Sequence, residues 1–182
     1  SGTLRVHDEV VVLPSNKKTF VKRIVTRDGD LLEASTPQSV TVTLADEIDV
    51  SRGDMLARPG NRPRVSRQVD AMIVWMSEQA MVPHKQYWLK HTTRRTSGEI
   101  SAVRYVIDVN TLHRTPGVAL KLNEIGRCEV LLRDPVIFDP YRRNRETGSF
   151  ILVDRITHET VAAGMFLDTD PDAGGEEHWD EQ

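Results

Sequence analysis

Residues 144–166, NRETGSFILVDRITHETVAAGMF, read as a tight β-hairpin that follows the basic run YRRNR. Two runs rich in apolar and β-branched residues, SFILVDR and TVAAGMF, flank THET, which we expect to make the reversal. Phe150 and Leu152 fall on one face of the first strand, and the apolar residues beside them fall on the other, so both faces should be buried. Gly148 permits a tight entry. We therefore expect this hairpin to close a β-barrel that packs against another part of the chain.

Short runs of the same composition recur along the chain and are separated by Gly, Pro, Asn and Asp. They are EVVVLP, FVKRIVT, SVTVTLA, AMIVWM, QYWLKHT, ISAVRYVID and CEVLLRD. Helical signals are weak, because Pro83 interrupts SEQAMVPHKQ and Pro116-Gly117 interrupts TLHRTPGVALKLNEIG. The sequence therefore predicts an all-β protein of the sandwich or barrel type.

The segment ARPGNRPR, residues 57–64, carries prolines, a glycine and arginines between two strand regions, and we place a domain boundary near Asn61. The predicted organisation is a first domain over residues 1–60, a second over 61–168 and an acidic tail over 169–182. The tail is expected to be disordered because it has little apolar surface to bury.

Charge and composition exclude several classes of protein. No apolar run approaches the roughly 20 residues that a membrane-spanning helix needs, and Cys128 has no second cysteine for an internal disulfide. The N-terminus lacks a secretory signal, so we expect a cytoplasmic protein. The net charge is −3, yet the last 15 residues hold seven of the 27 acids and no Lys or Arg. The remaining body has 24 Lys and Arg against 20 acids, which is mildly basic and too weak to demand a nucleic-acid partner.

Histidine and cysteine offer little sign of chemistry. His84 and His91 could share an edge, but neither has another ligand at zinc-binding spacing, and we favour solvated or hydrogen-bonding histidines over a metal site. Cys128 lies in the apolar run GRCEVLL, which favours a buried and inert thiol over a nucleophile.

The acids of ADEIDVSRGD, which are Asp46, Glu47, Asp49 and Asp54, could suggest a divalent cation, but the spacing lacks the glycine and glutamate of a calcium loop. We favour a solvated turn with an Asp/Arg pair. Glycine-rich phosphate cradles are missing from the sequence, and SNKKT, residues 15–19, is interpreted as a hairpin tip rather than a guanine-reading loop.

The basic run before the hairpin is the remaining candidate site. Arg142, Arg143 and Arg145 lie beside Tyr141, an arrangement that can bind phosphate or stack a base of RNA. The alternative is that these arginines lie at the rim of a protein interface or pair with neighbouring acids. We take Arg142, Arg143, Asn144 and Arg145 as interface candidates.

Two blocks of the sequence together resemble a known family. The first block is SGTLRVHDEVVV with its return DEIDVSRGDML; the second contains NTL, LNEIG and YRRNRETGSFILVDRITHETVAAGM. They are similar to the second and third β-barrel domains of the large, GTP-binding subunit of sulfate adenylyltransferase, a relative of elongation factor Tu. The resemblance covers nearly everything before the acidic tail.

This resemblance implies two antiparallel β-barrels, the first short of an N-terminal strand, and a glycine is usual in the family where His7 stands. It implies a cytoplasmic heterodimer that forms adenosine 5′-phosphosulfate from ATP and sulfate, driven by GTP. GTP and magnesium belong to a GTPase domain that has no match in this sequence, and the adenylyl transfer belongs to the small subunit. We therefore expect neither a catalytic residue nor a cofactor or metal site on this chain.

Two functions follow as hypotheses. In the first, the barrels are an accessory module whose partners are the GTPase domain of the same subunit and the small adenylyltransferase subunit. In the second, the barrels bind tRNA, as related barrels of elongation factors do; such binding would fall steeply with salt. We favour the first, because the body of the chain is only mildly basic.

Overall fold

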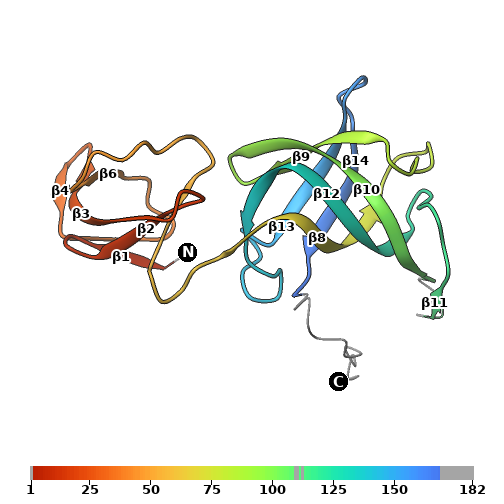
Figure 1. Ribbon diagram of the computed structural model, residues 1–182, viewed down its shortest axis with the longest axis horizontal. Coiled ribbons are helices and arrows are strands. Elements are labelled where there is room, and N and C mark those ends of the chain that lie inside the picture. Colours follow the sequence, from red (N-terminus) through yellow and green to blue (C-terminus); the bar gives the residue numbers. More distant parts are fainter. Residues whose placement is uncertain (1, 109–110, 112, 169–182) are drawn as a thin grey trace.

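The computed structural model describes residues 2–108, 111 and 113–168, and this part of the chain consists of β-strands and turns (Figure 1). The prediction of an all-β protein is therefore confirmed. The described residues form two units, joined by the segment between strands β7 and β8. Within this part of the chain, no helix is long and apolar enough to cross a membrane.

The first unit is an open arrangement of short strands. Its strands are β1 (Thr3–Arg5), β2 (Glu9–Leu13), β3 (Lys17–Thr26), β4 (Gly29–Leu31), β5 (Glu33–Ser35), β6 (Thr41–Leu44) and β7 (Met55–Ala57). A five-stranded sheet has the order β4-β3-β2-β7 with β6 also paired to β3, and β1 pairs with β5 separately. The unit has a small core cluster whose buried residues are Val10, Val21, Ile24 and Ala34.

The second unit is a closed antiparallel barrel of six strands. Its strands are β8 (Arg64–Trp75), β9 (Gln86–His91), β10 (Arg94–Ile107), β12 (Ile125–Phe138), β13 (Ser149–Asp154) and β14 (Thr160–Phe166), and the short β11 (Arg114–Thr115) is added outside β10. The ring runs β10-β12-β8-β14-β13-β9 and returns to β10, so these six strands have no free edge. Large apolar side chains such as Trp75, Leu89 and Phe166 fill its interior.

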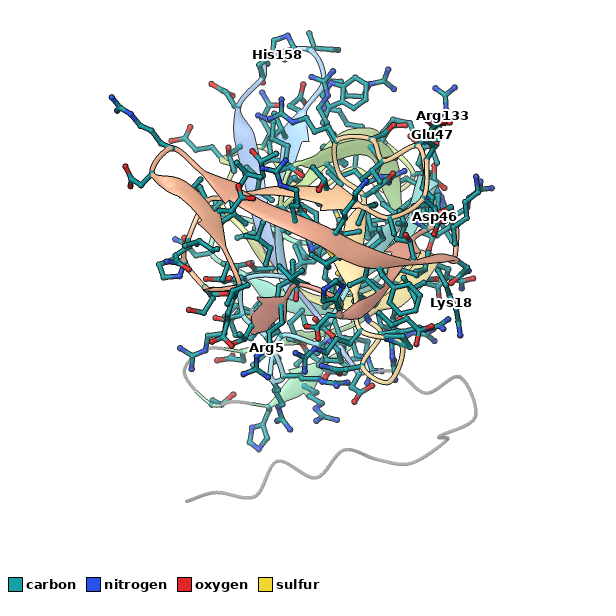
Figure 2. The ribbon with its side chains drawn as sticks, turned by 90° about the vertical axis from the view of Figure 1, so that its left-hand side faces the viewer. Arg5, Lys18, Asp46, Glu47, Arg133 and His158 are labelled. Atoms are coloured by element: carbon teal, nitrogen blue, oxygen red, sulfur yellow. The ribbon has the colours of Figure 1, made fainter. Side chains whose placement is uncertain are left out.

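The hairpin of β13 and β14 closes this barrel, as its sequence predicts. β13 pairs with β9, and β14 pairs with β8 on the other side. Phe150 and Leu152 are buried in the interior, and Val153 on the opposite face is also buried. The turn follows Asp154, whose carboxylate accepts the backbone N–H groups of Ile156 and Thr157 at 2.7 and 3.0 Å. Figure 2 shows His158 at the tip of this hairpin.

The resemblance implies a β-barrel short of an N-terminal strand for the first unit. The structure has an open sheet accompanied by a two-stranded one there, so the more specific interpretation as a barrel short of one strand stays a prediction. The proposed boundary near Asn61 lies in the connection between β7 and β8 and also stays a prediction. The predicted acidic tail, residues 169–182, lies outside the described residues.

The two units meet through an apolar contact. Val11 and Leu13 of β2 and Ala57 of β7 pack with Ile137 of β12 in one buried cluster. Ile137 is only 1% exposed, although it lies at the end of a barrel strand. We call these four residues the apolar seam. Val136 and Phe138 on either side of Ile137 belong to the barrel core, so the first unit packs against the outer face of β12.

Candidate interface at the junction of the two units

The four predicted interface residues lie in the loop between β12 and β13, next to the seam. The carbonyl of Pro140 accepts the backbone N–H groups of Arg143 and Asn144 at 2.9 and 3.1 Å, which folds the loop into consecutive turns. Gly148 ends the loop, and a side chain there would overlap the backbone of Tyr141. The absence of a Cβ at Gly148 therefore allows this loop to fold tightly, as the sequence predicts.

Side chains of this loop have different surroundings. Arg143 donates a hydrogen bond to the side-chain oxygen of Asn61 in the connection between the units. The side-chain oxygen of Asn144 accepts the N–H of Glu146 at 3.2 Å. The guanidinium of Arg145 lies 5.9 Å from the ring centroid of Tyr141. Arg142, Arg143 and Arg145 are exposed.

Arg143 and Asn144 also line a cavity of about 850 Å³ at the junction. Its other walls come from Asp139, Glu146 and Thr147 of the same loop, from the connection, and from the first unit, which contributes Leu4, Val10 and Leu56 among others. Arg143 is thus partly committed to the contact between the two units. The predicted role of the four residues in binding another protein stays a prediction.

His91 fixes the same loop from inside the barrel. Its Nε2 lies 2.8 Å from the carbonyl oxygen of Thr147, and the Thr147 hydroxyl donates to Asp139 at 2.8 Å. Burial lowers the pKa of His91, so the ring is neutral near pH 7 and donates from Nε2. His84, in contrast, is exposed and lies 3.2 Å from Glu99. Among the described residues, no three His, Cys, Asp or Glu side chains are grouped to hold a metal ion.

The acidic run supplies a second contact between the units. Asp54 accepts the N–H of Ser51 at 2.9 Å and lies 3.7 Å from Arg94 at the start of β10. Gly53, with a φ of 98°, packs against the side chain of Arg94, where a Cβ would be 3.0 Å from its nearest neighbour. The predicted turn and an Asp/Arg pair are both present, but Asp54 is largely covered rather than solvated, and its partner is Arg94 of the other unit.

The structure also bears on the predictions for Cys128 and for residues 15–19. Cys128 is fully buried, and burial raises the pKa of its thiol to about 12, so it is not a thiolate at neutral pH. Residues 15–19 include the turn between β2 and β3, with Asn16 at a φ of 59°, which confirms a hairpin tip.

Sequence reasoning missed a group of basic and aromatic residues beside the junction. The guanidinium groups of Arg95 and Arg155 lie 4.6 and 4.7 Å from the ring centroid of Trp88. Arg155 is 67 residues from Trp88 in the chain, so no local pattern predicts the contact. The alternation along QYWLKH could have placed Trp88 and Lys90 on one face of a strand, and it is the one signal in the sequence for this group.

Comparisons with known proteins agree with this architecture. A family model described as GTP-eEF1A C-terminal domain-like matches residues 68–167. A structure of sup35 complexed with GDP superimposes on 93% of the chain and 42% of its own length with a TM-score of 0.82; at 17% identity this shows the fold alone.

Curated relatives are more similar in sequence. The bifunctional enzyme CysN/CysC of Rhodopirellula baltica is 54% identical over the whole chain, which covers 28% of that protein. Sulfate adenylyltransferase subunit 1 of Aeromonas hydrophila is 51% identical over 92% of the chain and 35% of its own length. The chain thus spans about a third of the length of these relatives. It belongs to the GTP-eEF1A C-terminal domain-like family and is a homologue of sulfate adenylyltransferase subunit 1.

Proposed function

We propose that this chain is the non-catalytic β-barrel portion of the GTPase subunit of a sulfate adenylyltransferase. In this role it holds a GTPase domain against the small adenylyltransferase subunit and so supports GTP-driven formation of adenosine 5′-phosphosulfate. The identity of about 50% to subunit 1 proteins favours this role. The two units would move as one rigid block, so a movement of the GTPase domain would be transmitted to the small subunit.

The apolar seam is the structural observation that carries the proposal. A scaffold between two partners must resist bending at its own joint, and a buried apolar contact does this better than exposed ion pairs. Val11, Leu13, Ala57 and Ile137 provide such a contact. GTP and magnesium would bind to the GTPase domain; the described residues offer no grouped carboxylates that fit a magnesium site.

Titration calorimetry of this chain against the small subunit tests the proposal. Saturable binding to the small subunit, together with no binding of total tRNA at low and moderate salt, is the expected result. The tRNA arm is included because Arg52, Lys90 and Arg95 gather at a cavity of the junction. Salt-sensitive tRNA binding without subunit binding would instead favour the second hypothesis, a nucleic-acid module.

Charge-reversal variants test whether the predicted interface arginines contact the small subunit. We expect Arg142→Glu with Arg145→Glu to weaken binding of the small subunit at least tenfold, because both arginines are exposed beside the junction. Arg143→Gln serves as a separate variant, since Arg143 also bonds Asn61 within the chain. Lys17→Glu with Lys22→Glu, on exposed positions of β3, is the matched control. Unchanged binding by the first pair would remove the loop from the interface.

A further inference from the structure

The outer wall of the barrel has an apolar side, formed by strands β8, β14 and β13. In one row across these strands, Val74 pairs with Ala163, which in turn pairs with Ile151. In the next row, Met72 pairs with Met165. Among the described residues, none of these five belongs to one of the buried core clusters, because their side chains point away from the interior. We call these five residues the outer apolar face.

These three strands are apolar on both of their faces. Ile73 fills the interior while Val74 lies outside, and Phe150 fills the interior while Ile151 lies outside. An antiparallel sheet with water on its outer side normally alternates apolar and polar residues, so continuous apolar runs indicate strands that are covered on both faces. The first unit packs elsewhere, against β12 through Ile137. A further partner is needed to bury the outer apolar face.

The opposite side of the barrel wall is charged instead. On the outside of β10 and β12, Arg104 pairs with Glu129 at 2.8 Å, and Arg127 pairs with Asp70 at 2.9 Å. These charges already have partners within the chain and suit a surface in contact with water. The two sides therefore differ in what they can bind, and the apolar side is the one that fits a protein partner.

Cations and a tryptophan border the outer apolar face along β9. Ile151 pairs with Lys90 of β9, and Lys90 pairs with Arg95 of β10, so the row of the face continues directly into two cations. The guanidinium groups of Arg95 and Arg155 lie over the ring of Trp88, which is partly exposed. Tryptophan and arginine are enriched among the residues that contribute most to protein–protein binding.

The loop that carries the predicted interface arginines adjoins the face at the end of β14. The N–H of Tyr141 donates to the carbonyl of Phe166 at 2.9 Å, and Ser149, which follows the loop, pairs with Met165. The loop and the outer apolar face therefore form one continuous surface. This surface has an apolar centre and cations along two of its edges.

We propose that the outer apolar face is the centre of the surface that binds the small adenylyltransferase subunit; this rests on the proposed function. Permanent complexes of separate subunits have apolar interfaces, whereas contacts between domains of one chain are more polar. Exposed charges mainly add specificity and association rate, so Arg142 and Arg145 on one edge and Arg95 and Arg155 on the other form the rim. The matching surface of the small subunit has an apolar centre with Asp and Glu side chains at its edges.

Titration calorimetry with polar variants of the face tests this assignment. Ile151→Gln with Met165→Gln should weaken binding of the small subunit at least about thirtyfold, as expected for residues at the centre of an interface. Leu131→Gln with Val50→Gln is the matched control, because these apolar residues are 38% and 46% exposed elsewhere on the chain. The control pair should change the affinity less than about twofold. Unchanged binding by the first pair, with unaltered melting temperature, would overturn the proposal.

Alkylation of an introduced thiol examines the same face while keeping its apolar area. Ala163→Cys places a reactive group at the centre of the face, and the native Cys128 is buried and inert. Saturating small subunit should slow alkylation of the introduced thiol at least about tenfold and leave Leu131→Cys unaffected. Protection by the GTPase domain instead of the small subunit would overturn the proposal and leave the proposed function standing. A wild-type chain that does not bind the small subunit would overturn both.

Discussion

His7 is an exposed residue whose backbone adopts a conformation that favours glycine. Its φ is 72°, its N–H bonds the carbonyl of Val21 at 2.8 Å, and the next residue, Asp8, bonds back to Arg5 at 3.1 Å. A side chain in this left-handed region costs about 1 to 2 kcal/mol. Glycine avoids this cost, but it also gives the unfolded chain more conformational freedom, which offsets part of the stabilisation. Glycine, which the resemblance leads us to expect at this position, would avoid this cost.

We therefore predict that His7→Gly stabilises the protein by about 0.5 to 1 kcal/mol. The urea midpoint of unfolding should rise with an unchanged slope. Asn123→Gly is the matched control: Asn123 has a φ of 65°, but asparagine tolerates this region, so its change should be smaller. A lower midpoint for His7→Gly would show that the imidazole makes a compensating contact.

Asp154 links the barrel wall to the hairpin turn and gives stability a pH dependence. Its carboxylate accepts Lys85 Nζ at 2.6 Å in addition to the two turn N–H groups, and these bonds lower the pKa of Asp154 to about 2. Because the folded-state pKa lies below the ordinary value of 3.8, the stabilisation is present above about pH 4 and is lost as pH falls toward 2.

Asp154→Asn should accordingly destabilise the protein by about 1.5 to 3 kcal/mol at pH 7, the range for hydrogen bonds to charged groups. The difference from wild type should shrink as pH falls from 4 to 2. Urea unfolding at pH 7, 4 and 2.5 measures it. Asp30→Asn, at an exposed pair with Arg23, is the control and should change stability far less than Asp154→Asn, because solvent screens an exposed ion pair. A pH-independent difference would contradict the proposed ionic origin.

In strand β14, position 164 has to be glycine because the ring of Phe150 lies directly over it. Gly164 is paired with Phe150 across the hairpin, and a Cβ there would overlap the Phe150 ring. That ring is in turn packed on Phe166 with centroids 4.6 Å apart. The space left by the missing side chain at Gly164 is thus filled by an aromatic side chain of the partner strand.

Gly164→Ala should destabilise the barrel by about 1 to 3 kcal/mol, because the core must shift to admit one methyl group. Gly60→Ala provides the control, since a Cβ at Gly60 meets nothing within 4 Å. Thermal unfolding of the two variants measures the contrast. Similar melting temperatures for both would mean that the Phe150 ring moves aside freely.

The strands differ in how well the sequence predicts them. Apolar, β-branched runs predicted β2, β3, β6, β8, β9, β10, β12, β13 and β14, because such residues fit a buried pleated surface. Short strands such as β1, β4, β5 and β11 were missed, since two or three residues carry no period. β12 continues through Pro135, which a sequence pattern would place at a strand end; the ladder tolerates it because the register shifts between Leu131 and Val136.

The candidate site was only partly predictable for a related reason. The basic loop was visible because its residues are adjacent in the chain. The bond from Arg143 to Asn61 spans 82 residues, and the Arg94 partner of Asp54 lies 40 residues away. Contacts of this kind depend on how the two units pack, which a local pattern of residues does not encode.

For the whole molecule, the first unit depends on the barrel. Its core cluster has four buried residues, and an open sheet of this size is marginal alone. The apolar seam adds Val11 and Leu13 to the buried set by placing them against Ala57 and Ile137. We expect the wild-type chain to unfold in one cooperative transition, because unfolding of the barrel removes the surface of β12 that supports the first unit.

Ile137→Ala tests this dependence. Removing most of a buried isoleucine costs about 2 to 5 kcal/mol, and part of that loss falls on the contact between the units. Calorimetry should resolve two transitions in the variant, with the first unit melting at the lower temperature. Ile73→Ala, inside the barrel core, should lower the melting temperature but retain one transition, since the seam is intact. A single transition in Ile137→Ala would mean that the Asp54–Arg94 and Arg143–Asn61 contacts suffice to couple the two units.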